Sequence, residues 1–189
     1  EMGGVPSNME AYYSYDYGDA HFVVLNTQMA EMEQFQPGLL AEQTEWFKND
    51  IAKTDKKWKV VLMHKDVLTY AFKNRTDRQA GISDIGQAFM PLFDQYGVDV
   101  VLTAHLHTYR NRGNIYNFER DTKGPLYILT GVAGNVRYPE LWADHSLDVT
   151  VAPQPETDNY MTLEVSGNTL RLAAFLPDGK QIDKVEIKK

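Results

Sequence analysis

The feature that most constrains this chain is an apolar run over residues 98–103 that is closely followed by His105 and His107. The run is apolar and largely β-branched without alternation, which is typical of a strand buried on both faces of a sheet. If the chain stays extended after the run, the two imidazoles lie on the same side of the backbone. Two such rings bind one metal ion or two adjacent ions, or they are core or turn histidines bonded to backbone.

A second apolar run, residues 58–63, is of strand length and also stops at a histidine, His64. Between the runs, apolar side chains recur over residues 85–96 at the i, i+3, i+4, i+7 spacing of an amphipathic helix. Ser83 is suited to cap the start of this helix and Gly97 to end it. Strand, helix and strand in this order predict a right-handed crossover between parallel neighbours.

This topology brings His64 toward the His-x-His sequence. The carboxyl ends of parallel strands lie along one edge of a sheet, and open α/β sheets bind their ligands there. We therefore expect His64, His105 and His107 to converge within reach of a metal ion. The chain contains no cysteine, so such a site would use nitrogen and oxygen ligands.

The other segments predict a hairpin, one more helix and several strands. Pro37-Gly38 precedes the apolar stripe of the helix, and tight turns at Gly18-Asp19, Gly167-Asn168 and Asp178-Gly179 separate the strands at the two ends of the chain. The expected ranges are 11–17 and 20–26 for the hairpin, 39–53 for the helix, 126–130 for a short strand, and 161–165, 169–175 and 180–187 for an antiparallel meander.

Several of these stretches match motifs of a known family. The chain resembles the calcineurin-like metallophosphoesterases of the purple acid phosphatase type, whose motifs include an apolar strand ending in His and the sequence Gly-His-x-His-x-Tyr-Glu-Arg. The matching stretches are Trp58 to His64, Ala104 to Tyr109, Tyr13 to Thr27, Gln43 to Phe47 (a Gln-x-x-Trp-Leu helix), Gly124 to Gly134 and Tyr160 to Lys189.

The resemblance implies an α/β fold, part of an αββα sandwich of mixed β-sheets. It also implies two metal ions, iron, zinc or manganese, with His64 and His105 as ligands of the divalent ion and His107 as a ligand of the other. The family's remaining ligands would precede Glu1. Residues 1–189 are therefore expected to be a single domain that forms the carboxyl-terminal portion of the family's catalytic domain and is inactive alone.

Substrate binding and the departures from the family pattern concern other residues. Arg75 and Arg78, in a long polar loop after His64, and Tyr109 are candidate substrate-binding residues, with Lys65 as a further cation. No catalytic residue beyond the metal ligands is assigned. The departures are Asp66 in place of a proline, Ala104 in place of a glycine and Arg110 in place of a carboxylate.

The remaining histidines are expected to lie outside the site. His21 lies at a turn rather than at the carboxyl end of a strand, so we expect a structural role. His145 lies in an irregular, proline-containing segment, so we expect a surface residue.

Composition limits the partners. The net charge of -7 and the absence of a basic run argue against nucleic acid, whereas a metal site reverses the local sign for a phosphate-ester substrate. No membrane span or leader is apparent, and the resemblance alone favours a secreted or cell-surface protein. A sheet without its upstream neighbours would favour self-association. Two other functions stay open: a non-catalytic module that retains the scaffold, and a three-histidine zinc hydrolase.

Overall fold

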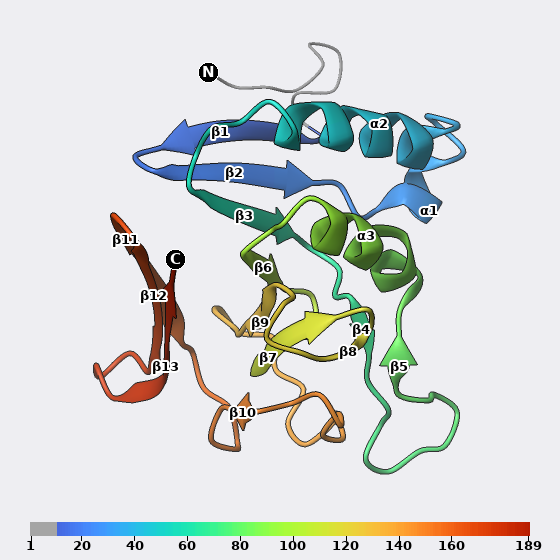
Figure 1. The fold of residues 1–189 in the computed structure, drawn as a ribbon. Helices are drawn as coiled ribbons and strands as arrows, with labels where there is room; N and C mark the ends of the chain where they lie inside the picture. Colours follow the sequence, from blue (N-terminus) through green and yellow to red (C-terminus); the bar gives the residue numbers. More distant parts are fainter. Residues whose placement is uncertain (1–10) are drawn as a thin grey trace.

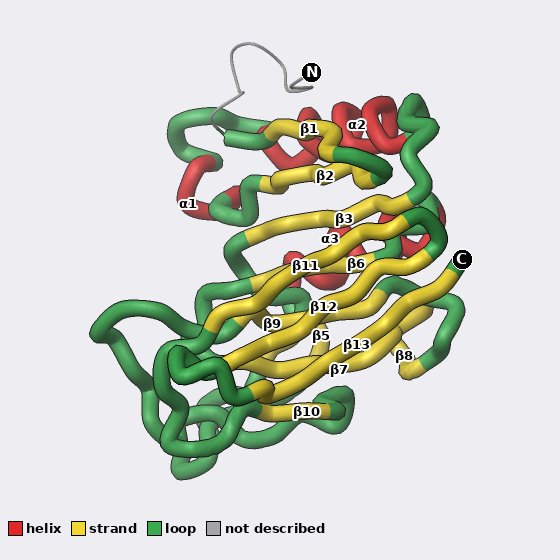
Figure 2. Tube along the Cα trace, turned by 90° about the vertical axis from the view of Figure 1, so that its left-hand side faces the viewer, coloured by secondary structure: helices red, strands yellow, loops and turns green. Residues whose placement is uncertain are grey.

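A large mixed sheet forms the middle layer of the structure, a computed structural model that describes residues 11–189. Three helices cover one face of this sheet and a small antiparallel sheet covers the other, as Figures 1 and 2 show from two directions. The helices are α1 (Met29–Met32), α2 (Leu39–Ile51) and α3 (Asp84–Gln95).

The large sheet has the strand order β1-β2-β3-β6-β9-β7-β10, with β8 paired to β7. Its central strands β2, β3, β6 and β9 are parallel, and β1, β7 and β10 run antiparallel to their neighbours. Their bounds are β1 Tyr13–Tyr17, β2 Ala20–Leu25, β3 Trp58–Met63, β6 Val100–Thr103, β7 Tyr109–Tyr116, β8 Glu119–Arg120, β9 Leu126–Thr130 and β10 Thr150–Val151.

The central strands are buried on both faces because each face has its own core. One core packs α2 and α3 against the sheet through Phe47, Phe89 and Phe93. The other core packs the small sheet against the opposite face around Trp58 and Leu170. The small sheet consists of β11 (Tyr160–Ser166), β12 (Thr169–Phe175) and β13 (Gln181–Lys188).

The crossover from β3 to β6 forms as the sequence predicts. Ser83 caps α3 by accepting a hydrogen bond from the N–H of Gly86 at 3.1 Å, and the helix ends at Gln95, two residues before Gly97. Strands β3 and β6 then pair in parallel from Val60 opposite Val100. The carboxyl ends of β3 and β6 therefore lie side by side.

The expected α/β sandwich is confirmed, with differences in detail. The small sheet is wholly antiparallel, because the β11-β12-β13 meander is joined by tight turns. Among residues 11–189, no helix covers its outer face (Figure 2). The strand expected at 98–103 begins at Val100, and a two-stranded ribbon, β4 (Leu68–Thr69) with β5 (Gly81–Ile82), closes the loop after His64.

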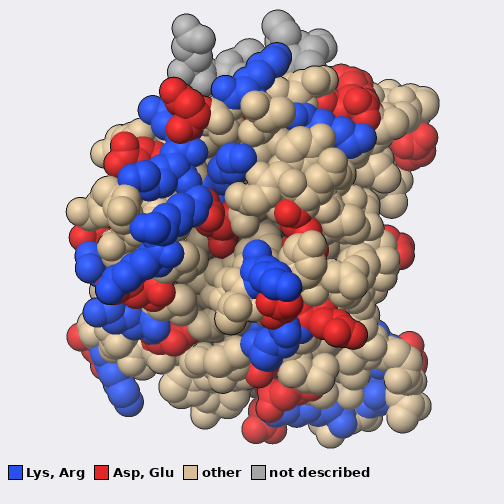
Figure 3. Space-filling model, in the orientation of Figure 1, with Lys and Arg blue, Asp and Glu red and all other residues tan. Residues whose placement is uncertain are grey.

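Charge is distributed unevenly over this fold. In the view of Figure 3, basic side chains gather along the left-hand side, where the small sheet lies. Strands β2 and β3 point to the right in the same orientation (Figure 1), so this basic row lies away from their carboxyl ends. Within the described residues, no helix is long and apolar enough to cross a membrane.

Candidate metal site and its supporting network

Two of the three predicted ligands meet at the carboxyl edge of the sheet. His64 directly follows β3, and His105 lies two residues after β6. Nδ1 of His105 lies 3.0 Å from Nε2 of His64, and the ring planes are inclined by 76° with centroids 4.9 Å apart. Both side chains are exposed at the rim. The pair is therefore accessible to an ion from solvent.

The turn after β6 has an unusual backbone. His105 and His107 have φ values of 72° and 50°, in the left-handed region that residues other than glycine seldom adopt. Backbone bonds hold this turn, because the N–H of Ala104 donates to the carbonyl of His64 at 3.0 Å. The indole of Trp142 donates to the carbonyl of Leu106 at 2.9 Å. The strained turn is thus fixed from both sides.

His107 does not join the other two in direct contact. Its Nδ1 lies 3.2 Å from the carbonyl oxygen of Val136, and its ring packs against Tyr138 with centroids 5.1 Å apart. Among residues 11–189, no three His, Asp or Glu side chains are grouped closely enough to hold an ion. The structure therefore brings together His64 and His105 and leaves the predicted convergence of all three a prediction.

The predicted substrate residues differ in position. Arg78 is half-buried over the aromatic rings of Phe72 and Trp142. Arg78 and His105 both border a groove on the surface between α1 and α3. Arg75 is exposed and lies 3.7 Å from Asp77. Tyr109 is 2% exposed, and its hydroxyl donates to Asp183 of β13 at 2.9 Å, in the core beneath the small sheet. This placement gives no support to substrate binding by Tyr109.

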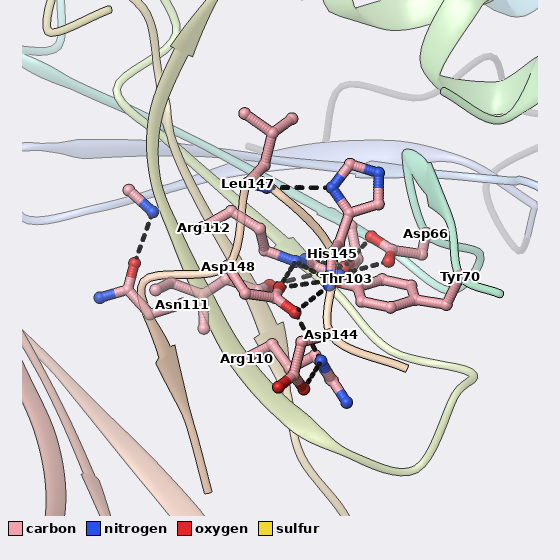
Figure 4. Close-up of polar contacts among 12 residues, drawn as sticks. Asp66, Tyr70, Thr103, Arg110, Asn111, Arg112, Asp144, His145, Leu147 and Asp148 are labelled. Atoms are coloured by element: carbon pink, nitrogen blue, oxygen red, sulfur yellow. Dashed lines mark hydrogen bonds and ion pairs between the residues drawn. The ribbon is translucent and has the colours of Figure 1, made fainter. Parts of the chain in front are cut away.

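A buried polar network lies behind the histidine pair (Figure 4). Asp66, two residues after His64, forms an ion pair with Arg112 of β7, and both side chains are almost fully buried. The hydroxyl of Thr103, two residues before His105, donates to Asp66 at 2.8 Å. Asp66 and Thr103 therefore link the two chain segments that present the histidines.

The network continues away from the site. Arg112 donates to the hydroxyl of Tyr70 at 3.0 Å, and Tyr70 donates to Asp148 at 2.6 Å. Asp148 also pairs with Arg110, which replaces the carboxylate of the family pattern. Arg110 is buried and directed into this cluster (Figure 4). Two arginines and two carboxylates thus balance each other inside the fold.

His145 belongs to this cluster, and its predicted surface position is wrong. Its side chain is 8% exposed and packs on the ring of Tyr70 at 5.5 Å between centroids. Its Nδ1 accepts the N–H of Leu147 at 3.1 Å. Burial lowers its pKa below the ordinary value, so the ring is neutral at neutral pH. The irregular segment folds inward because it carries Asp148 to the buried arginines.

The pKa values of His105 and His21 shift in opposite directions. Partial burial, the adjacent His64 imidazole and the Lys65 ammonium lower the pKa of His105, which favours the neutral form that binds metals. Burial alone would lower the pKa of His21, but its bonds to Asp50 at 2.9 Å and Asp16 at 2.7 Å raise it overall. His21 is buried away from the pair, which confirms its structural role.

Comparison with known proteins agrees with this geometry. The family model described as "Calcineurin-like phosphoesterase" matches residues 4–109, more than half of the chain. The chain belongs to this family. The match includes the β3 to β6 crossover and ends at the residue where β7 begins, so it contains all three histidines predicted as ligands.

The relatives are phosphatases. Purple acid phosphatase 15 of Arabidopsis thaliana is 32% identical over 80% of this chain, and purple acid phosphatase 23 is 34% identical over 69%. The chain spans 27% of the length of each. Acid phosphatase type 7 of Mus musculus is 26% identical over 72% of this chain, which spans 37% of that relative. This calcineurin-like phosphoesterase chain is thus of the purple acid phosphatase type.

Two solved structures share the fold. A purple acid phosphatase from yellow lupin superposes with a TM-score of 0.57 at 17% identity, covering 98% of this chain and 34% of that one. A Plasmodium protein described as "GAP50 the anchor in the inner membrane complex" superposes with a TM-score of 0.62 at 13% identity, covering 94% of this chain and 53% of that one. At these identities the comparison concerns the fold alone.

The spacing of the imidazole pair fits a shared ion of the kind this family uses. Two nitrogens bonded to one ion at about 2.0–2.1 Å are about 2.9 Å apart at a right angle and about 3.4 Å apart at the tetrahedral angle. The separation of 3.0 Å between His64 and His105 lies within this range. For His107, the hydrogen bond of Nδ1 leaves Nε2 as the nitrogen suited to a metal.

Sequence reasoning missed the network behind the pair. Asp66 and Arg112 are 46 residues apart, and Tyr70 and Asp148 are 78 apart, so no local periodicity connects them. One signal was present. Asp66 and Arg110 both depart from the family pattern, and the structure shows that each contributes a charge to the same buried cluster.

Proposed function

We propose that the complete protein containing this chain is a metal-dependent phosphoesterase that hydrolyses phosphate esters. The observation that supports it most is the imidazole pair, 3.0 Å apart at the carboxyl edge of parallel strands in a member of this family. A structural histidine pair needs no such exposure, whereas these two rings lie at the solvent-facing rim. The relatives' phosphatase names point to the same chemistry.

Each histidine has a proposed role. His64 and His105 hold one ion, and His107 ligates a second through Nε2, with iron, zinc or manganese as the metals. Held by these histidines, two ions would supply Lewis acidity to the phosphoryl oxygens and to the water used in hydrolysis. The remaining ligands are proposed to come from parts of the complete protein outside these 189 residues. By resemblance to the family, that protein is proposed to act outside the cell or at its surface.

Arg78 is the proposed phosphoryl-binding cation. Its guanidinium lies 5.1 Å from the centroid of Trp142, whose indole is bonded to the turn between His105 and His107. Among residues 11–189, no carboxylate lies within ion-pair distance of Arg78, whereas Lys65 is 2.5 Å from Glu31. A guanidinium without a carboxylate partner is available to phosphate oxygens.

The roles are tested in the complete protein by replacing one histidine at a time. His105→Ala and His107→Ala are expected to reduce hydrolysis of a generic phosphate monoester by at least a hundredfold and to lower the metal content. The matched control is His21→Gln, a buried histidine outside the site, which should leave the metal content unchanged. Full activity in His105→Ala would overturn the proposed assignment.

The chain of 189 residues is proposed to be inactive alone. Three imidazoles divided between two ions leave each ion short of ligands, and no carboxylate among residues 11–189 is grouped with them to bridge the ions. The test is elemental analysis of the purified chain and monoester hydrolysis with added zinc, manganese or iron. Robust turnover by a monomer would instead support a three-histidine zinc hydrolase.

A non-catalytic module is the second candidate. Asp66, which is buried and paired with Arg112, and the buried Arg110 both occupy positions where the family pattern has another residue. Metal content separates the two functions. A complete protein that binds no metal after reconstitution with zinc, manganese or iron would support the module.

A further inference from the structure

A groove beside His105 has no role in the proposed chemistry. It has a volume of about 580 Å³ and lies among α1, α3 and the β4-β5 ribbon, with His105, Lys65 and Arg78 on its border. Small-molecule sites usually occupy about 300–1,000 Å³. We call it the α1–α3 groove, and its apolar lining includes Met29, Leu40, Leu68, Ile82, Ile85 and Ala88.

The groove is amphipathic in a way that matches one class of ligand. The side chains that line its apolar part are aliphatic, and among the described residues no Phe, Tyr or Trp borders it. A nucleotide base would find no ring on which to stack. The guanidinium of Arg78 and the imidazole of His105 border the same hollow, and so does Lys65, which is paired with Glu31. An anion with an aliphatic tail satisfies both parts.

Three acidic residues, Glu33, Asp66 and Asp84, border the groove, and they differ in how far their negative charge would repel an anionic ligand. The carboxylate of Asp66 is directed into the buried network, where Arg112 and Thr103 bind it. Glu33 and Asp84 also border the groove and are exposed, and Glu33 accepts a hydrogen bond from the N–H of Gly38. Among the loop residues 73–80, only Arg78 is half-buried, and the others are exposed. Its position over Trp142 holds one positive charge beside the groove and the imidazole pair.

We propose that the α1–α3 groove binds the organic group of the substrate, and that this group is an aliphatic chain attached to the phosphoryl group that reacts at the histidines. This inference rests on the proposed phosphoesterase function and adds the class of ester to it. The aliphatic walls exclude water from the chain, and burial of each methylene is favourable by an amount equivalent to about a fourfold gain in kcat/KM.

The test uses the complete protein and a series of straight-chain alkyl phosphates from ethyl to octyl. We expect kcat/KM to rise about three- to fourfold per methylene until the groove is full. Ala88→Phe fills the groove from α3 and should flatten this rise, whereas Gln87→Phe, on the exposed side of the same helix, should leave it unchanged. Leu40→Gln, at a position 37% exposed, should also reduce the rise without threatening the fold.

The outcomes separate this inference from the proposed function. A flat series with active enzyme overturns the groove and leaves the phosphoesterase intact, and so does a rise that Ala88→Phe and Leu40→Gln do not alter. If no ester is hydrolysed, the proposed function fails. Calorimetry with the matching alkyl phosphonates then measures the groove directly, and affinity that does not rise with chain length overturns it.

Discussion

Replacing Arg112 with Met should destabilise the fold far more than replacing any exposed arginine. The Arg112 side chain is fully buried, and burial would lower its pKa, but the charge of Asp66 with help from Tyr70 and Asp148 raises it, so the guanidinium stays charged. Methionine fills a similar length without charge. The variant leaves the Asp66 carboxylate buried with only the hydroxyl of Thr103 and one backbone N–H as donors.

The expected loss follows from this unpaired charge. Removing one partner of a buried ion pair costs about 3–5 kcal/mol of unfolding free energy. With a urea dependence of about 2 kcal/mol per molar, the midpoint of unfolding should fall by about 1.5–2.5 M. The control is Arg171→Met, because Arg171 pairs with Glu164 and Glu186 at the surface, where the loss of an ion pair should barely change the midpoint.

A double variant tests the reason rather than the size of the effect. Asp66→Asn with Arg112→Met removes both charges, so it should be less destabilising than Arg112→Met alone by about 2 kcal/mol. Because Asp66 links the histidine segments, Asp66→Asn should also weaken zinc binding by the complete protein about 10- to 100-fold. The reasoning is refuted if the urea midpoint of Arg112→Met lies less than about 1 M below that of Arg171→Met. It is also refuted if the double variant is less stable than Arg112→Met.

Three further predictions concern other parts of the fold. Because the pKa of His21 is raised in the fold, its interaction with Asp50 stabilises the fold fully below about pH 6.5 and less as the pH rises through the folded-state pKa. The difference in melting temperature between the unmodified chain and His21→Gln should therefore shrink from about pH 5.5 to about pH 8.5. A Cβ on Gly86 would lie 2.2 Å from the carbonyl oxygen of Val67, so Gly86→Ala should cost at least about 2 kcal/mol in urea unfolding, whereas Gly81→Ala, with open space around it, should change little. Strand β1 has β2 as its only partner among the described residues, so sedimentation of the 189-residue chain should show self-association that grows with concentration, and a monomer at all concentrations would contradict this.

The sequence predicts this fold well where the information is local. The two apolar runs, the helical stripe over 85–96 and the capping role of Ser83 each depend on residues within one turn or one strand. Parallel pairing then places His64 beside His105 without knowledge of any other contact. The candidate site is predictable to that extent because strand direction alone decides which residues share the edge.

The remainder depends on contacts between distant residues. The irregular, proline-containing segment suggested a surface position for His145, but its ring is buried against Tyr70. Nothing local in the sequence indicated that Arg110 is buried beside Asp148. The direction of His107 was not predictable from the local pattern either. An extended His-x-His would present both rings on one side, whereas left-handed φ values at both histidines redirect the second toward Val136.

Those left-handed histidines imply a conflict between stability and chemistry at two positions. Each costs of order 1 kcal/mol or more relative to glycine, which adopts positive φ freely, and asparagine tolerates it better than most residues. A library of all residues at positions 105 and 107, sorted only for folded protein, should thus enrich glycine and asparagine. The same library sorted for metal retention by the complete protein should return histidine. A position at which the two sorts prefer different residues is one where histidine is kept for metal binding rather than for stability.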